Sequence, residues 1–160
     1  MLAKAVLPLA LLFILAACGG SKQGQARATV GVHGPGFTFE APQGWRVAKK
    51  ADGAVARRGK ALVSVSRVPL LKTYDPAEFR AVTKELDNVA NRLAHEAGEE
   101  RATGQTTSVA GRKVRSYRYG DRRLGFVLEG KREYQLFCEP AGTACDLLYS
   151  SFTLSGPQAS

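Results

Sequence analysis

Residues 105–138 read QTTSVAGRKVRSYRYGDRRLGFVLEGKREYQLFC and hold four stretches in which polar and apolar residues alternate. Tight-turn signals separate these stretches at Ala110-Gly111, Gly120-Asp121 and Gly130, about ten residues apart. Turn signals at this spacing are typical of consecutive antiparallel strands. We therefore predict a meander of four strands, at residues 105–109, 112–119, 122–129 and 131–138.

A long helix is predicted before the meander. Asp75-Pro76-Ala77-Glu78 combines an acidic N-cap, a proline at the first helical position and a glutamate that can complete a capping box. Gly98 is a typical stop signal. Between these signals, apolar residues recur at steps of three and four and form one stripe. The stripe consists of Phe79, Val82, Leu86, Val89, Ala90, Leu93 and Ala97. One stripe predicts that the helix packs on one face of the sheet.

Shorter elements are expected on both sides of this core. Strands are predicted at residues 37–40 and 45–48, around a Pro-Gly turn, and at residues 54–57 and 61–68 after the hairpin signal Asp52-Gly53. Thr143-Ala144-Cys145-Asp146 is typical of the capped start of a short C-terminal helix, and residues 152–154 form a last extended segment. The predicted fold class is α+β, a twisted antiparallel sheet with one long helix and one short C-terminal helix.

The N-terminus predicts export and lipid attachment. Residues 5–17 are apolar but too few to cross a bilayer, which takes about 20 apolar residues. They match the hydrophobic region of a secretory signal peptide. Leu15-Ala16-Ala17-Cys18 resembles the lipobox of bacterial lipoproteins, in which the cysteine receives a diacylglycerol before cleavage. The alternative is an ordinary signal peptide followed by a chance cysteine.

These motifs divide the chain into four parts. We expect a signal peptide at residues 1–17, a lipidated Cys18 with a glycine-rich flexible tether through residue 35, one domain at residues 36–155 and a tail at residues 156–160. The protein is then lipid-anchored on the extracytoplasmic side of a bacterial membrane. The membrane is its partner through the Cys18 lipid, and the domain is expected to be a monomer.

The chain has a net charge of +9, and removal of residues 1–17 takes away one cation, Lys4, which leaves +8. This excess favours anionic neighbours such as lipid headgroups, wall polymers or an acidic protein. The export signal argues against nucleic acid as a partner. The alternative is that the excess reflects the charge balance of an Arg- and Ala-rich proteome.

The chain has three cysteines, an odd number. Lipidation of Cys18 leaves Cys138 and Cys145, which are expected to be oxidised outside the cytoplasm. The six-residue spacer is rich in turn-forming residues, and a disulfide that closes so small a loop contributes roughly 2–3 kcal/mol. A redox-active or metal-binding dithiol is the alternative, but the spacing is not CxxC and no histidine lies nearby in the sequence.

Three short motifs resemble those of PsbP-like proteins, the photosystem extrinsic subunit and its bacterial single-domain relatives. Residues 37–45, FTFEAPQGW, are similar to the family's opening segment, Val109-Ala110-Gly111 to its hairpin after the main helix, and Ser151-Phe152 to its closing pair. The resemblance covers about residues 37–154. It implies an α/β/α sandwich, no catalytic residues and an accessory role in larger envelope or membrane complexes. The cysteine pair departs from the family pattern.

No sequence motif indicates catalysis. The sequence contains no GxSxG, Walker loop or dinucleotide-binding glycine motif. Its two histidines are His33, expected in a loop before the first strand, and His95, expected near the end of the long helix. His95-Glu96 lacks the second histidine of a metalloprotease HExxH motif. We therefore expect no enzymatic activity, no catalytic residues, no cofactor and no metal site.

Two binding hypotheses follow. Alternate turns of a meander lie at the same end of the sheet, so the cations after the first and third turns are expected to cluster. Arg112, Lys113, Lys131 and Arg132 then form a candidate anion-binding patch for lipid headgroups or wall polymers. Charged turns that discourage aggregation are the alternative explanation.

The second hypothesis is a surface groove for a protein or small ligand, with Tyr117, Tyr119 or Tyr149 as contacts unless they lie in the core. The expected function is that of a lipid-anchored extracytoplasmic accessory or binding protein of the cell envelope. An envelope hydrolase is the weaker alternative.

Overall fold

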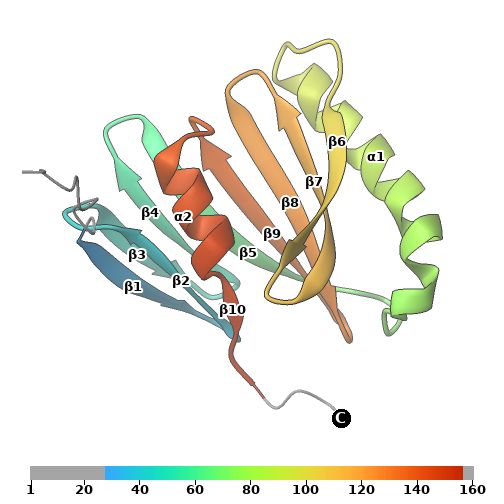
Figure 1. The fold of residues 1–160 in the computed structure, drawn as a ribbon, viewed down its shortest axis with the longest axis horizontal. Coiled ribbons are helices and arrows are strands. Elements are labelled where there is room, and N and C mark those ends of the chain that lie inside the picture. The colour runs from blue at the N-terminus through green and yellow to red at the C-terminus, as the bar shows by residue number, and fades with distance from the viewer. Residues whose placement is uncertain (1–27, 157–160) are drawn as a thin grey trace, which may run out of the picture.

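The domain contains two antiparallel sheets and two α-helices (Figure 1). The computed structural model describes residues 28–156, so the predicted signal peptide, the lipidation site Cys18 and residues 157–160 of the predicted tail lie outside the described residues. One long helix, one short C-terminal helix and antiparallel strand pairs confirm the predicted α+β class. Between residues 28 and 156, no helix combines the length and apolar character needed to cross a membrane.

Seven strands form the larger sheet in the order β3-β4-β5-β9-β8-β7-β6. Their bounds are β3 Arg46–Lys50, β4 Gly53–Arg58, β5 Ala61–Pro69, β6 Thr103–Val109, β7 Arg112–Tyr119, β8 Arg122–Glu129 and β9 Arg132–Glu139. Strands β6 to β9 are neighbours both along the chain and in the sheet, which confirms the predicted meander. The smaller sheet has the order β1-β2-β10, with β1 Thr29–Gly34, β2 Phe37–Pro42 and β10 Thr153–Leu154.

The long helix begins with a capped turn. The Asp75 carboxylate accepts a hydrogen bond of 2.8 Å from the backbone N–H of Ala77, and a 3₁₀ turn at Pro76–Glu78 leads into α1 (Phe79–Glu96). Glu78 does not complete the predicted capping box, because its carboxylate instead pairs with Lys72 at 3.3 Å. The buried residues of α1 are Leu86, Ala90 and Ala94, spaced by four, so its apolar face lies on the sheet as expected.

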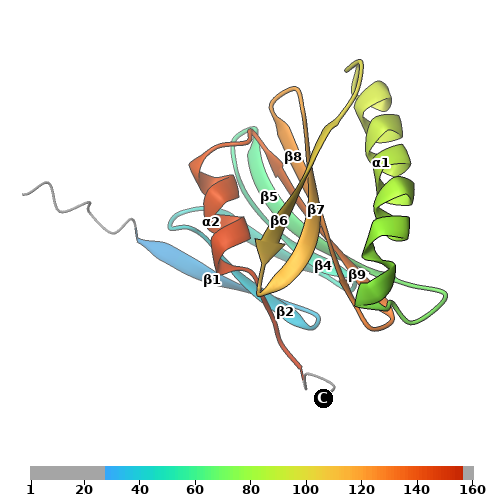
Figure 2. The same cartoon turned by 45° about the vertical axis from the view of Figure 1, so that its right-hand side comes forward.

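The two helices cover opposite faces of the larger sheet (Figure 2). Successive side chains of a strand point to opposite faces, and in β8 Leu124 and Phe126 pack under α1 while Val127 faces the other side. On that side, α2 (Thr143–Ser151) and the three-stranded sheet enclose a second core around Phe37 and Phe152. The layer on this face of the larger sheet therefore consists of α2 and the three-stranded sheet.

The N-terminal boundary differs from the prediction. Strand β1 pairs along its whole length with β2, and Val32 is completely buried, so a tether that extends to residue 35 is wrong. His33 lies in this strand, with an exposed side chain, rather than in a loop. The glycines at 31 and 34 gave the segment the composition of a linker. An edge strand next to β2 needs only alternate apolar residues to be stable, and Val30 and Val32 supply them.

Candidate functional site

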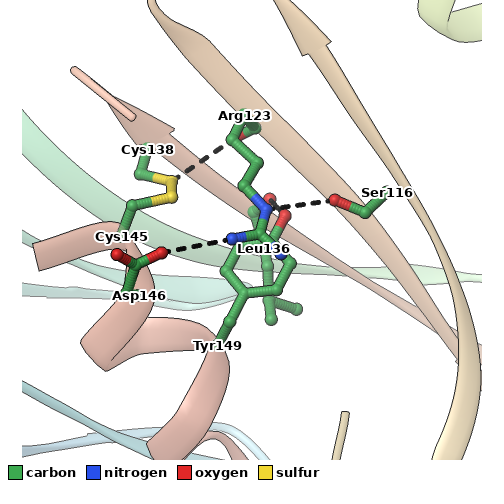
Figure 3. Close-up of a disulfide and its surroundings, with 7 residues drawn as sticks. All are labelled: Ser116, Arg123, Leu136, Cys138, Cys145, Asp146 and Tyr149. Carbon is green, nitrogen blue, oxygen red and sulfur yellow. Dashed lines mark hydrogen bonds and ion pairs between the residues drawn. A yellow bond between two sulfur atoms is a disulfide. The ribbon is translucent and has the colours of Figure 1, made fainter. Parts of the chain in front are cut away.

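A disulfide joins Cys138 and Cys145, which confirms the predicted pair (Figure 3). Cys138 lies in β9 and Cys145 in the first turn of α2, with Cα atoms 5.5 Å apart, and both residues are buried. Reactive cysteines are partly exposed, so this arrangement favours a structural cross-link over a redox dithiol. The predicted side-chain cap at Thr143 is wrong, because the N-cap position is Gly142 and no side chain caps the helix.

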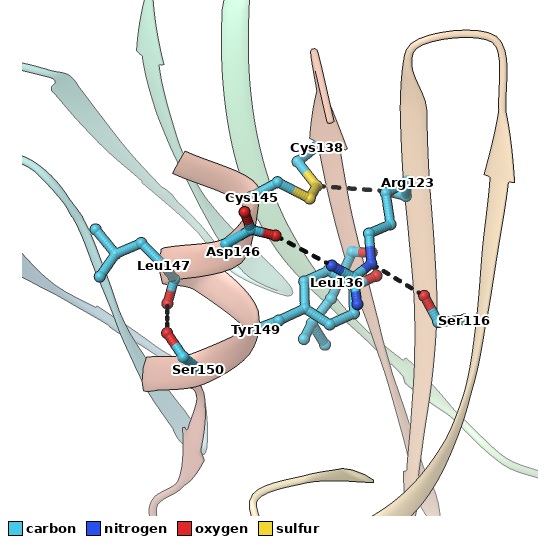
Figure 4. Close-up of polar contacts among 9 residues, drawn as sticks. All are labelled: Ser116, Arg123, Leu136, Cys138, Cys145, Asp146, Leu147, Tyr149 and Ser150. Atoms are coloured by element: carbon cyan, nitrogen blue, oxygen red, sulfur yellow. Dashed lines mark hydrogen bonds and ion pairs between the residues drawn. A yellow bond between two sulfur atoms is a disulfide. The ribbon is translucent and has the colours of Figure 1, made fainter. Parts of the chain in front are cut away.

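Arg123 packs beside the disulfide and holds α2 against the sheet (Figure 4). Its guanidinium lies 3.7 Å from the centroid of the Tyr149 ring, and its Nε donates to the Ser116 hydroxyl at 3.2 Å. The Tyr149 hydroxyl donates to the Leu136 carbonyl at 3.3 Å, and burial raises the pKa of Tyr149 to about 12. The Arg123 side chain is only 11% exposed, so it acts as a structural cation and is not accessible to an anionic ligand.

The best candidate for a binding site is a cleft of about 580 Å³ at the end of the meander where the β6–β7 and β8–β9 turns lie. Arg112, Lys131 and Arg132 all line it, so three of the four predicted patch residues lie together. The fourth, Lys113, is exposed but does not line the cleft. Arg112 and Lys113 are adjacent in β7, so their side chains point to opposite faces of the sheet.

Arg112 is already paired within the protein. Its Nε and Nη2 donate to the two carboxylate oxygens of Glu129 at 2.7 and 2.9 Å, and its Nη1 donates to the Ala110 carbonyl at 3.1 Å. These bonds raise the pKa of Arg112 and lower the pKa of Glu129. Such a bidentate pair fixes the shape of the cleft wall but adds little net charge to it.

Lys131 and Arg132 supply the cationic character of the cleft. Both side chains are exposed, and neither belongs to an ion pair found among residues 28–156. The charged lining residues are three cations and one carboxylate, so the cleft has a formal charge of +2. An anionic group that enters the cleft would therefore contact these two side chains first.

Aromatic residues complete the cleft, and the sequence analysis did not single them out. Tyr134, only 3% exposed, packs edge-on against Phe37 at 5.9 Å and reaches the cleft from the core. A Cβ atom at Gly36, where φ is +83°, would lie 3.2 Å from the Tyr134 hydroxyl, so glycine lets the β1–β2 turn come close. Tyr74 also lines the cleft.

The segment that carries Tyr74 wraps around the β8–β9 turn. The backbone N–H of Leu70 donates to the Lys131 carbonyl at 2.9 Å, and that of Tyr74 donates to the Gly130 carbonyl at 2.7 Å. Between these two anchored residues, the side chain of Leu71 is fully exposed. Leu71 therefore lies in a segment bonded to the β8–β9 turn, but it is not one of the residues that line the cleft.

A second, polar cleft lies between α1 and the β6–β7 hairpin. Asp87 accepts hydrogen bonds there from the Tyr117 hydroxyl at 2.6 Å and from Arg115 Nε at 2.9 Å, and His95 lines the same cleft. Burial and the bond to Asp87 raise the pKa of Tyr117 strongly, which makes its hydroxyl a poor general base. We interpret this cluster as the polar attachment of α1 to the sheet.

The tyrosines proposed as surface contacts lie in the core. Tyr117, Tyr119 and Tyr149 are 1%, 6% and 7% exposed, so none of them is an exposed surface contact, although Tyr117 lines the polar cleft under α1. Their aromatic rings were needed to fill the two cores on either face of the sheet. Within residues 28–156, no group of three or more His, Cys, Asp or Glu side chains could hold a metal ion.

Comparison of the chain with models of protein families and with curated proteins gave no match.

Proposed function

We propose that this protein is a lipid-anchored accessory protein of the bacterial cell envelope, which binds an acidic segment of a protein partner in the cleft at the β8–β9 turn. The anchor is the lipid on Cys18, proposed from the lipobox Leu15-Ala16-Ala17-Cys18. The Cys138–Cys145 disulfide agrees with an oxidising, extracytoplasmic location. We also propose a PsbP-like fold, supported by the order of the elements and by the motif at residues 37–45.

The composition of the cleft is the main support for binding of an acidic segment. Lys131 and Arg132 offer charge that no ion pair among residues 28–156 neutralises. The Arg112–Glu129 pair, which lies between them and the β6–β7 turn, offers a fixed wall. Tyr and Arg are enriched where protein interfaces concentrate their binding energy. A cleft that combines them accommodates a carboxylate beside an apolar side chain.

Leu71 favours a protein over a wall polymer. A fully exposed leucine, one residue after Leu70, which bonds to the Lys131 carbonyl, gains binding energy only from an apolar partner. Wall polymers present phosphates and sugars, which would use the cations and leave Leu71 in water. We therefore propose an acidic protein segment that also carries an apolar residue, and treat an anionic polymer as the competing outcome.

The test measures binding of the purified full chain to two probes, a Glu- and Leu-containing peptide and poly(glycerol phosphate). The double variant K131E/R132E is expected to weaken peptide binding at least tenfold, since each cation near an anionic site contributes about 1 kcal/mol. The variant K84E/K113E makes the same change in net charge at exposed residues outside the cleft and should bind as the wild type does.

Two results would contradict the proposal. Equal weakening by both double variants would show a response to net charge and not a site. Binding of poly(glycerol phosphate) that is tighter than peptide binding and unaffected by Leu71→Ser would identify a polymer as the ligand. In cells, a photo-crosslinker at Lys131 should give a defined protein adduct that the same crosslinker at Lys113 does not give.

A further inference from the structure

A second basic surface lies on the β3–β4–β5 hairpins, which the sequence analysis did not single out. Residues 46–60 contain six lysines and arginines and one acidic residue, Asp52. All six cationic side chains are exposed, and none belongs to an ion pair found in the described part of the chain. These six are Arg46, Lys49, Lys50, Arg57, Arg58 and Lys60.

The strand register gathers four of these cations at one end of the domain. Arg46 lies directly opposite Arg57, and Arg58 lies opposite Ala61 across the turn that carries Lys60. We call Arg46, Arg57, Arg58 and Lys60 the basic end. Like charges placed opposite one another destabilise a sheet, so this arrangement is unfavourable for the isolated domain and favourable beside an anionic surface.

The described chain also begins at the basic end. Thr29 pairs with Pro42, and the backbone N–H of Gln43 donates to the Ala28 carbonyl at 2.9 Å, so the start of β1 lies beside the turn that leads to Trp45 and β3. Figure 1 shows the start of β1 and the start of β3 at the same side of the molecule. Cys18 is ten residues before Ala28, which limits its distance to about 36 Å.

Trp45, the only tryptophan of the chain, directly precedes Arg46 of the basic end. It is partly buried against the core and lines an open, mainly apolar groove of about 530 Å³ with Thr29, Pro42 and Leu147, in which Asp146 is the one charged residue. Tryptophan is enriched at the level of lipid headgroups, where its ring contacts apolar groups while its N–H stays near water. The basic end thus combines an interfacial side chain with four cations.

We propose that the basic end docks on the surface of an anionic phospholipid bilayer, with Trp45 at headgroup level and Arg46, Arg57, Arg58 and Lys60 near the lipid phosphates. This inference rests on the proposed lipid anchor at Cys18, because the anchor brings the bilayer to the end of the domain where the tether enters. Strand β1 runs from Thr29 at the basic end to Gly34, two residues before Gly36 in the cleft. Docking therefore points the cleft away from the bilayer.

The experiment uses the full lipidated chain reconstituted in vesicles of phosphatidylcholine, with or without phosphatidylglycerol. Fluorescence of the single Trp45 reports the contact directly, because brominated lipids quench only a tryptophan that reaches the bilayer. Quenching is expected with phosphatidylglycerol and is expected to be largely absent in neutral vesicles or at high salt. R57E/R58E should reduce the docked fraction roughly tenfold or more, since each reversed cation changes the interaction strongly.

The matched control is K131E/R132E, which makes the same charge change at the cleft and should leave quenching unchanged. Equal quenching in neutral and anionic vesicles, no quenching in either, or equal loss in both double variants would overturn the docking proposal. Flotation with the vesicles is measured in the same samples. A chain that fails to float with either lipid mixture lacks the anchor, whereas a chain that floats without quenching of Trp45 has the anchor but does not dock.

Discussion

Gly125 provides the most specific test of how α2 is seated on the sheet. A Cβ atom at this position in β8 would lie 2.6 Å from the Tyr149 hydroxyl oxygen and 2.9 Å from Cε1 of the same ring. Ordinary contacts between such atoms are about 3.5–4.0 Å. The Tyr149 ring cannot easily move away, because Arg123 stacks on it and the disulfide holds the first turn of its helix. Gly125→Ala therefore forces either the ring or the strand to shift.

These close contacts are expected to lower the free energy of unfolding. Overpacking of a dense core costs about 1–3 kcal/mol, and the restrained ring favours the upper half of that range. Replacement of glycine by alanine returns about 0.4–1 kcal/mol through the unfolded chain. We therefore expect Gly125→Ala to lower the free energy of unfolding by about 2 kcal/mol, measured by urea denaturation followed by circular dichroism.

Two further measurements make this prediction specific. In a double-mutant cycle, the cost of Gly125→Ala should fall partly when combined with Tyr149→Phe, which leaves the 2.9 Å ring contact, and almost completely with Tyr149→Leu. Gly31→Ala is the control, since a Cβ there meets only His33 Nε2 at 3.5 Å. A loss of less than about 0.5 kcal/mol for Gly125→Ala, or an equal loss in all three backgrounds, would contradict a clash with the Tyr149 ring.

Reduction of the Cys138–Cys145 disulfide, which closes a loop with a sequence separation of 7, should lower the free energy of unfolding by about 2.5 kcal/mol, and urea titration with and without dithiothreitol measures this. Burial disfavours the ionised form of Asp87, but the bonds from Tyr117 and Arg115 outweigh it and lower its pKa. This stabilisation is present above the unfolded-state pKa and is lost as the pH falls through the folded-state pKa, so Asp87→Asn should flatten the acid limb of a plot of melting temperature against pH. Leu71→Ser should leave the melting temperature unchanged, because the side chain is fully exposed, but should weaken peptide binding at the cleft.

Features that depend on local spacing could be predicted from the sequence. The turns at Gly120-Asp121 and Gly130 are set by glycines at positive φ, so the strand bounds of the meander followed directly from their positions. The disulfide followed from the number of cysteines. The Arg112–Glu129 pair could have been found in the same way. A two-residue turn at Gly120-Asp121 places Arg115 opposite Phe126, and the same register extended by three residues places Arg112 opposite Glu129.

Features that depend on how elements pack in space could not be predicted. The contact of Asp87 with Arg115 and Tyr117 requires the position of α1 on the sheet, which no local pattern specifies. The burial of Tyr149 likewise depends on the position of α2 over β9, which the sequence does not specify. Strand β1 was missed for a different reason, because its glycines gave it the composition of a tether while β2 supplied its hydrogen bonds.

The position of the two basic surfaces bears on which anionic partner each can meet. Lipid headgroups were a candidate for the residues of the meander turns, but Lys131 and Arg132 lie at the end of the domain opposite Ala28, from which the chain leads back to Cys18. A bilayer held by that lipid would face Arg46, Arg57 and Arg58 first. The cations of the domain therefore form two separate surfaces at opposite ends. The basic end suits the membrane of the proposed lipid anchor, and the cleft suits a partner that approaches from the aqueous side.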